Sequence, residues 1–383
     1  MSFKTFVRNF LFPASILSGT IIGAGMFALP YVFAEVGYML GVLYFVLFAA
    51  ILSVVHLMYA DIILRSGGKP QFAYFAKKYL GDWSFYPAIL VGTVGLILVL
   101  TIYLILSVSF VRLVAPVPAE AIVTIFWLMA SLAVFVEIRK IAMLELFFTL
   151  STVLIVGVLF YLGVPRLGVF ISEKSWVSFS PALFILPFGP ILFAFTGRTA
   201  IPSIINYFKK TNLSIKALKA VIIWGTMAPI FIYLLFIAGI AGLSGRISSD
   251  AVSGLFLPSF VVLLGVGILG LVEIFSTYIL VGRRIRDSLV YDLNFSSWSA
   301  ALLVVALPIT LYLSGLQNFF SLVGIVGGIF LAAELLFIVL IWRALNNEGG
   351  EQKLIRHLGP KTVFSILVIL FGGFLYEIFS LLA

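Results

Sequence analysis

The stretch of sequence that decides the fold reads Ser18-Gly19-Thr20-Ile21-Ile22-Gly23-Ala24-Gly25-Met26-Phe27-Ala28-Leu29-Pro30. It lies inside an apolar run from Phe10 to Ala34, which is too long for a signal-peptide core and fits a membrane-spanning helix. Three glycines within seven residues weaken a helix and allow close backbone approach, and Pro30 frees a carbonyl in the preceding turn. We therefore expect a spanning helix that is interrupted at membrane depth.

The composition of the whole chain is that of a polytopic membrane protein. Of its 383 residues, 63% are hydrophobic and 10% are charged, against roughly 45–50% and 25% in an ordinary soluble domain. This argues against a soluble enzyme and a disordered protein, and the lack of cysteine argues against a disulfide-stapled secreted domain. With only two histidines we expect no metal centre, and we attribute the net charge of +9 to basic loops rather than to a nucleic-acid partner.

Apolar runs of spanning length recur along the chain. They predict eleven transmembrane helices, at about residues 11–36, 38–65, 83–113, 119–137, 141–165, 182–206, 217–243, 255–283, 297–315, 318–343 and 361–382. With the N-terminus placed in the cytoplasm, the inner segments hold 19 lysines and arginines and the outer segments hold four, as the positive-inside rule requires. We therefore expect the N-terminus in the cytoplasm and the C-terminus outside, and we take the membrane to be the inner membrane of a prokaryote.

The opening stretch has a counterpart further along the chain. Residues 25–30 read Gly-Met-Phe-Ala-Leu-Pro and residues 197–202 read Gly-Arg-Thr-Ala-Ile-Pro, at an offset of 172. The same offset maps the third predicted helix onto the eighth, and five helices separate the copies, so the copies have opposite orientations. We predict one all-helical transporter domain with inverted repeats at about 11–165 and 182–343 and an added helix at about 361–382.

The sixth predicted helix also contains helix-breaking residues, namely Pro187, Gly189, Pro190, Gly197 and Pro202. Irregular backbone at membrane depth is buried in protein or lines a cavity. The helix ends that it frees offer N–H groups to an anion and carbonyl groups to a cation, and a zwitterionic amino acid needs both. The alternative is that glycines such as Gly19 and Gly23 form only a helix-packing face, but their repetition at equivalent positions favours broken helices.

At these residues the sequence resembles the amino acid–polyamine–organocation superfamily. The stretch from Gly19 to Pro30 resembles its first-helix signature, and Phe193-Ala194-Phe195-Thr196-Gly197-Arg198-Thr199-Ala200-Ile201-Pro202 resembles its sixth-helix segment. The closer similarity is to the amino acid/auxin permease branch and to the bacterial tryptophan/tyrosine permeases. The resemblance implies the leucine-transporter fold, with discontinuous helices one and six, and ion-coupled symport of amino acids by alternating access. Related permeases often carry histidine at the position of Arg198, so this chain departs from the pattern there.

The resemblance also implies where the substrate binds. It places the site at the breaks of helices one and six, with help from helices three and eight. The residues that we expect there are Thr20, Ile22, Gly23, Ala24, Gly25, Tyr103, Phe193, Ala194, Phe195, Thr196, Gly197 and Arg198. The aromatic rings in this set are candidate walls of an apolar pocket. We expect a neutral, hydrophobic or aromatic amino acid as cargo, and the alternative is another small solute on the same fold, such as an amine, a cation or a nucleobase.

Ionisable residues inside the spans carry the coupling hypotheses, because a charge at the bilayer centre costs about 2.5–3.5 kcal/mol on insertion scales. Arg198 and Glu273 lie at similar predicted depths, so we expect them to form an ion pair. Three interpretations are open: the pair is a static bridge, Glu273 binds the coupling proton under the influence of Arg198, or Arg198 holds the substrate carboxylate. For His56 and Glu334 we expect structural hydrogen bonds.

Sodium is the alternative coupling ion. Ser276 and Thr277 follow Glu273 by three and four residues and share its face of the helix. Together with the carbonyls of Gly19 and Ile22, they resemble the sodium site of sodium-coupled relatives. The competing interpretation is that both hydroxyls bond to their own helix backbone.

Glu145 is a further coupling candidate, although its position near Arg139 and Lys140 also predicts an interfacial salt bridge. The chain contains no HExxH, GxSxG or Walker A motif. We therefore expect a transporter and not an enzyme. Its expected partners are a small amino acid and the lipid bilayer, and we expect no cofactor beyond a transported proton or a bound sodium ion.

Overall fold

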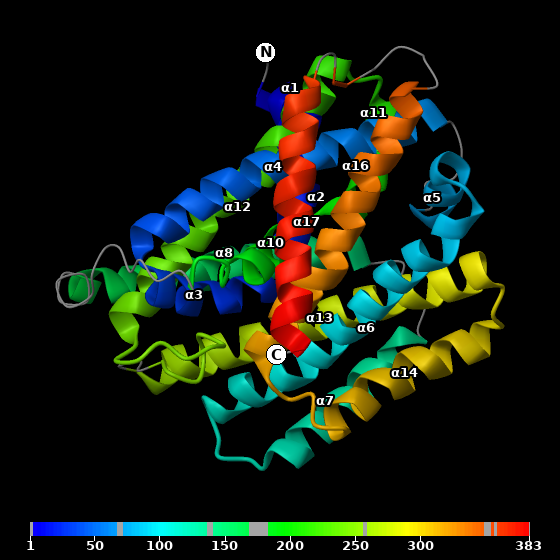
Figure 1. Cartoon of the computed structure of the whole chain (residues 1–383). Helices are drawn as coiled ribbons and strands as arrows, with labels where there is room; N and C mark the ends of the chain where they lie inside the picture. The colour runs from blue at the N-terminus through cyan, green and yellow to red at the C-terminus, as the bar shows by residue number, and fades with distance from the viewer. Residues whose placement is uncertain are drawn as a thin grey trace.

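The computed structural model describes residues 3–66, 72–135, 141–167, 183–255, 259–347, 354–355 and 358–382, with only the backbone for 141–149. In this part of the chain the structure is almost entirely helical (Figure 1). The first half forms, in order, α1 (Phe3–Phe6), the π-helical turn η1 (Val7–Leu11), α2 (Phe12–Ile21), the 3₁₀ turn η2 (Ala24–Ala28), α3 (Leu29–Val36), α4 (Tyr38–Ser66), α5 (Phe72–Leu80), η3 (Asp82–Ser84), α6 (Phe85–Arg112), α7 (Ala119–Val134), α8 (Ile141–Gly163) and η4 (Val164–Arg166).

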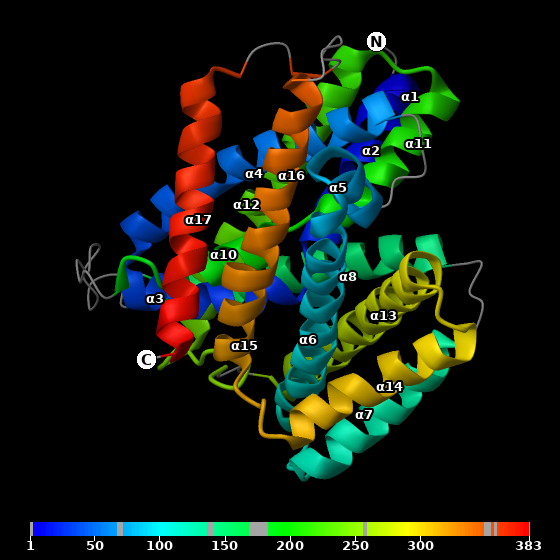
Figure 2. The same cartoon turned by 45° about the vertical axis from the view of Figure 1, so that its right-hand side comes forward.

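The second half of the chain is also built from helices joined by short turns. It forms α10 (Phe188–Phe195), the 3₁₀ turn η6 (Arg198–Ala200), α11 (Ile201–Thr211), α12 (Ile215–Leu243), α13 (Phe260–Leu293), α14 (Ser297–Leu313), α15 (Phe319–Ile325), the π-helical turn η7 (Val326–Leu331), α16 (Ala332–Asn347) and α17 (Pro360–Leu382). In Figures 1 and 2, α4 and α16 lie in the upper part of the molecule, α7, α13 and α14 lie in the lower part, and α17 runs from the top past the middle.

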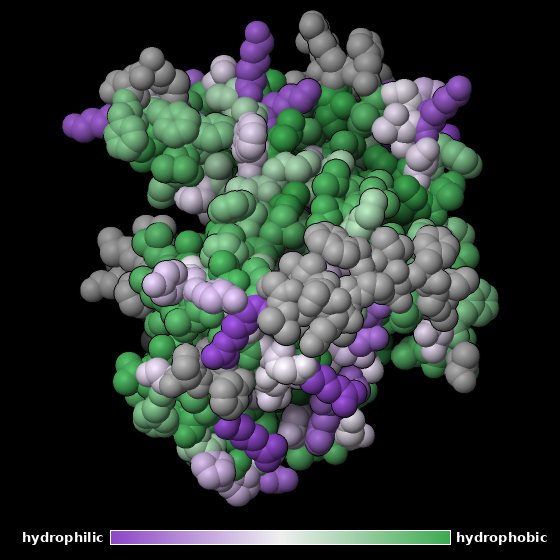
Figure 3. Space-filling model, turned by 90° about the vertical axis from the view of Figure 1, so that its left-hand side faces the viewer, coloured by the Kyte–Doolittle hydropathy of each residue, from purple (hydrophilic) through white to green (hydrophobic). Residues whose placement is uncertain are grey.

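The length and apolar character of these helices identify an integral membrane protein. Among the described residues, seven helices can cross a membrane, and the bent pair Phe3–Ile21 and Ala24–Val36 makes an eighth candidate. Three shorter apolar helices, Ala119–Val134, Leu150–Arg166 and Ser297–Leu313, lie where the remaining spans are predicted. Figure 3 shows apolar atoms over much of one face, with hydrophilic side chains toward its top and in its lower part. The all-helical membrane class is thus confirmed, while the count of eleven and the inverted repeat stay predictions.

Two predicted helices have different boundaries in the structure. The sixth, expected at about 182–206, is divided into α10 and α11. The eighth, expected at about 255–283, runs from Phe260 to Leu293 as α13. It continues past the basic residues because no terminator occurs until Asn294, which takes the left-handed conformation (φ 56°) that ends a helix.

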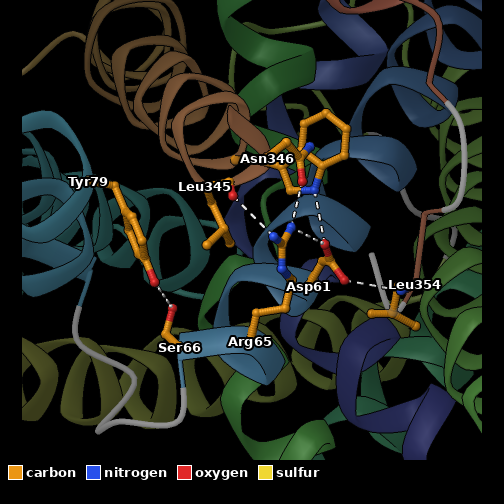
Figure 4. Close-up of polar contacts among 8 residues, drawn as sticks. Asp61, Arg65, Ser66, Tyr79, Leu345, Asn346 and Leu354 are labelled. Atoms are coloured by element: carbon orange, nitrogen blue, oxygen red, sulfur yellow. Dashed lines mark hydrogen bonds and ion pairs between the residues drawn. The ribbon is translucent and has the colours of Figure 1, made fainter. Parts of the chain in front are cut away.

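A buried polar cluster joins one end of α4 to the end of α16 (Figure 4). Asp61 is fully buried, and its carboxylate accepts hydrogen bonds from the Trp342 indole N–H at 3.2 Å and the Leu354 backbone N–H at 3.1 Å. Its oxygen also lies 3.6 Å from Arg65, which donates to the Leu345 carbonyl at 3.0 Å. Because Leu354 follows α16, these bonds tie the segment after α16 to α4.

Candidate functional site

The helix that carries the opening motif stops at Ile21. Ile22 (φ −70°, ψ 103°) and Gly23 (φ −160°, ψ −157°) are extended, and the chain continues through η2 into α3. The two parts of the span are bent by 51°. Because the helical ladder is interrupted, the carbonyl of Ile21 loses the partner that a continuous helix would provide. Pro30 lies in the first turn of α3, where its missing N–H costs nothing.

The second motif repeats this geometry. Thr196 is extended (φ −70°, ψ 117°), η6 follows, and Pro202 occupies in α11 the place that Pro30 occupies in α3. Ala28 and Ala200, which are 172 residues apart, each end a 3₁₀ turn. Both expected interruptions are therefore present, at equivalent positions of the two motifs.

The two breaks lie directly against each other. A Cβ atom added at Gly25 would lie 2.5 Å from the Cα atom of Ala194, which precedes the second break. One added at Gly197 would lie 2.7 Å from side-chain atoms of Leu17 and Ile21, which precede the first break. Each motif glycine thus permits contact with the helix that leads into the other break.

A single tyrosine hydroxyl connects the two breaks. Tyr233 of α12 is fully buried, and its oxygen lies 2.8 Å from the Ile21 carbonyl and 2.7 Å from the Ala194 carbonyl. These are the carbonyls at the ends of α2 and α10, and one hydroxyl proton can serve only one of them fully at a time. The tyrosine ring packs edge-on against Phe195, with the ring centroids 5.4 Å apart.

His56 of α4 holds the second break from another side. Its Nε2 lies 3.3 Å from the Gly197 backbone nitrogen, and its Nδ1 lies 3.0 Å from the Thr226 hydroxyl. Thr226 and Tyr233 are seven residues apart in α12, so one face of that helix reaches both breaks. Neither Thr226 nor Tyr233 was among the predicted site residues. Their sequence pattern, two hydroxyl side chains two turns apart in an apolar span, could have identified them.

Arg198 pairs with Glu334 of α16, so the predicted Arg198–Glu273 ion pair is wrong. Its Nε and Nη2 donate to the two carboxylate oxygens, with an Nη2–Oε2 distance of 3.0 Å. The guanidinium also lies over the Phe72 ring of α5, 4.7 Å from the centroid, and bonds to the Tyr59 hydroxyl. The prediction failed because depths were counted along unbroken helices, whereas the sixth span is broken and α13 runs ten residues past its expected end.

Thr199, the residue after Arg198 in the second break, is hydrogen-bonded to α13. The hydroxyl of Thr199 accepts a hydrogen bond of 2.6 Å from Nη1 of Arg284. The 3₁₀ turn η6 is therefore connected by directed polar contacts to α16 and to α13.

Glu273 lies beside the first break. It is buried in α13 and accepts a hydrogen bond from Thr152 of α8. With Met26 and Phe27 it lines a cavity of about 20 Å³, which has room for one water molecule. Within the described ranges, no cation forms an ion pair with this carboxylate. Tyr103, which is also buried, is close enough to interact electrostatically with it.

The other predicted substrate residues divide by burial. The buried ones beside the breaks are Ile22, Ala24, Gly25, Ala194, Phe195 and Gly197, and the half-buried ones are Thr20, Gly23, Phe193, Thr196 and Arg198. The hydroxyls of Thr20 and Thr196 bond to carbonyls of their own helices, at 2.9 and 2.7 Å. Phe195 packs among aromatic rings, 5.2 Å from Phe45, so it belongs to the aromatic core around the site.

Two of the predicted ion-coupling residues use their hydroxyls within their own helix. Ser276 and Thr277 donate to the backbone carbonyl of Glu273, at 2.8 and 2.9 Å, as the competing interpretation expects. A sodium site shared with Gly19 and Ile22 therefore stays a prediction. The side chain of Glu145 lies outside the described residues.

The loop between α12 and α13 borders the same cavity. Val252 and Leu255 line it, and Asp250 anchors the loop by accepting hydrogen bonds from the Ser253 hydroxyl at 2.6 Å and the Ser109 hydroxyl at the end of α6. Burial alone raises the pKa of Asp250, but these hydrogen bonds offset it and hold the pKa below its ordinary value.

Comparison with known proteins adds the family. The model described as the tryptophan/tyrosine permease family matches residues 7–282, which include both breaks, Tyr233 and Glu273. A search of curated proteins finds no match. A permease family indicates a transporter rather than an enzyme. Because the match covers well over half of the chain, this protein belongs to the tryptophan/tyrosine permease family, a family of the amino acid permease type.

Proposed function

We propose that the protein takes up a neutral, hydrophobic or aromatic amino acid by secondary active transport, through alternating access. The description of its family favours an aromatic cargo. The observation that carries the proposal is the contact between two broken helices, at which the carbonyls of Ile21 and Ala194 converge on one hydroxyl. Breaks of this kind supply the opposed backbone charges that a zwitterion requires.

The substrate binds where Tyr233 now bridges the breaks. An ammonium group carries three protons, so it satisfies the carbonyls of Ile21 and Ala194 together, which one hydroxyl cannot do. The N–H groups at the start of η2 suit the carboxylate. Gly23 has open space in place of a Cβ atom, which leaves room for the substrate backbone, and half-buried Phe193 is available to its side chain.

Coupling is to a proton, with Glu273 as the binding group. An uncompensated carboxylate at membrane depth is costly, and proton binding removes that cost. Glu273 has no cationic partner in the described part of the chain and borders the cavity beside the first break. The guanidinium of Arg198 is engaged by Glu334, which favours a structural role for Arg198 over substrate binding. Sodium bound at Ser276 and Thr277 is the alternative.

Uptake by proteoliposomes tests the function. Radiolabelled tryptophan, tyrosine, phenylalanine and leucine are compared with an amine and a nucleobase, under a pH gradient or a sodium gradient imposed separately. The expected result is concentrative uptake of the aromatic amino acids driven by the pH gradient. Uptake of the amine or the nucleobase alone would instead support the alternative cargo. Dependence on sodium alone would support a sodium site at the Ser276 and Thr277 hydroxyls.

Glu273→Gln separates coupling from binding. We expect this variant to lose pH-driven accumulation but to retain exchange of labelled for unlabelled substrate without a gradient. Glu120→Gln is the matched control, because Glu120 is an exposed carboxylate in the first turn of α7. If Glu273→Gln accumulates substrate like the control, Glu273 is not the proton site.

A further inference from the structure

One carboxylate connects the last helix to the first part of the broken sixth span. Glu377 of α17 accepts a hydrogen bond from the backbone N–H of Gly189, in the first turn of α10. The N–H groups of a first turn have no partner within their own helix, and they form the positive end of its dipole. Figures 1 and 2 show α17 beside α16, at the level of α10.

Two glycines, Gly328 and Gly189, make room for this carboxylate, and a third, Gly324, lies at ordinary contact distance. A Cβ atom at Gly328 would lie 2.2 Å from Cγ of Glu377, and one at Gly189 would lie 3.0 Å from its Oε1. At Gly324 the distance to Oε2 would be 3.8 Å. Gly328 belongs to the π-helical turn η7, and such turns occur frequently at functional sites. The sequence of two helices is thus adapted to receive a charged side chain from a third.

Glu377 has no other charged neighbour in the helices that surround it. Helices α10 and α15 and the turn η7 contain no ionisable side chain, and Glu334 of α16 is engaged by Arg198. On α17 itself, Tyr376 is exposed, and Lys361 is sixteen residues away, about 24 Å along a helix. In the part of the chain that the structure describes, Glu377 forms no ion pair.

We propose that Glu377 is a proton-responsive latch on α10. When ionised, it holds the N-terminal end of α10 against α17 and η7. When protonated, it loses its interaction with the helix dipole and its charge-assisted hydrogen bond, so α10 is free to move. The inference rests on the proposed function, because α10 carries Phe193, Ala194 and Phe195 to the candidate substrate site.

Hydrogen–deuterium exchange of the full chain in lipid nanodiscs tests the latch without any cargo. The readout is the protection of residues 188–195, corrected for intrinsic exchange, between about pH 5 and pH 8. We expect protection in the unmodified protein to fall about two- to fivefold as the pH decreases. We expect Glu377→Gln to show the low protection at every pH, and Glu120→Gln to follow the unmodified protein. The α12 segment around Tyr233 serves as an internal reference.

Two alanine variants give the same test without changing a charge. Gly328→Ala displaces the Glu377 side chain, so it should behave like Glu377→Gln. Gly324→Ala places a methyl group at ordinary contact distance, so it should behave like the unmodified protein. If both Glu377→Gln and Gly328→Ala keep normal, pH-dependent protection of α10, the latch is wrong. Absent uptake of every amino acid would contradict the proposed function instead, and would leave the exchange result to decide the latch.

Discussion

The two helix breaks follow the same backbone path but are held by different forces. In the first break, from Ile22 to Ala28, no side chain is ionisable, and Phe27 packs edge-on against Phe110 and Phe236 at 5.2 and 5.6 Å. In the second, from Thr196 to Ala200, directed polar contacts reach α4, α13 and α16. The first break is therefore held by the fit of apolar surfaces, and the second by hydrogen bonds and charge. Changes in size should damage the first, and changes in charge should damage the second.

The largest expected loss of stability comes from removing one charge of the ion pair at the second break. Arg198→Met or Glu334→Gln alone leaves a buried charge without its partner, which costs about 3–5 kcal/mol. The double variant removes both charges and should recover much of that loss. Thermal unfolding in detergent measures all three. If the double variant loses the sum of the two single losses, the second break does not depend on this ion pair.

A smaller effect is expected from adding volume at the first break. Gly25→Ala drives a methyl group into the backbone of Ala194, and overpacking of this kind costs about 1–3 kcal/mol. Gly23→Ala adds the same methyl group two residues earlier, in open space, and should be nearly neutral. Unfolding temperatures of the two variants provide the comparison. Equal losses would show that the first break is not held by close packing.

Removing the Tyr233 hydroxyl, which contacts both breaks, should lower stability moderately. Tyr233→Phe keeps the ring contacts but leaves the Ile21 and Ala194 carbonyls without a donor, at a cost of about 1–2 kcal/mol. Saturating substrate should restore this stability, because its ammonium group supplies the missing protons. The measurement is the shift in unfolding temperature with and without tryptophan. A substrate shift no larger than that of the unmodified protein would contradict the proposed position of the ammonium group.

The smallest expected effect on stability comes from Asp250, in the loop beside the cavity, and it depends on pH. The pKa of folded Asp250 lies below its ordinary value of 3.8, so its stabilising contribution is complete above that pH and is lost as the pH falls further. Asp250→Asn should therefore lower stability by about 1 kcal/mol near neutral pH and remove part of the acid dependence. Unfolding temperatures from about pH 6 to pH 3 test this. Parallel curves for both proteins would rule out the contribution.

The sequence predicted both breaks because their cause is local. Glycines and prolines act on the backbone within one or two turns, so Pro30 and Pro202 mark the start of α3 and α11 without any knowledge of packing. The charges could not be assigned in the same way. The partner of Arg198 depends on the bend at Thr196 and on where α13 ends, and both are outcomes of folding.

Contacts between helices that are distant in the chain could not be predicted from the sequence either. Tyr233 reaches both breaks only because of how α12 is rotated, and periodicity does not predict that rotation in a span that is apolar on every face. The last helix was predicted as an addition to the repeats, and its contact with α10 through Glu377 was not predicted. Residues whose roles depend on a third helix were thus the ones missed.

The contacts of His56 also determine which of its nitrogens carries a hydrogen. The Gly197 amide can only donate, so Nε2 must present a lone pair, and the hydrogen of a neutral ring is on Nδ1, directed at Thr226. The Thr226 hydroxyl in turn donates to the Ile222 carbonyl at 2.9 Å, so every group in this chain of bonds has a fixed direction. An imidazolium would place two N–H groups head to head at Gly197. His56 therefore stays uncharged while the second break keeps this shape, which the ¹⁵N chemical shifts of its ring would verify.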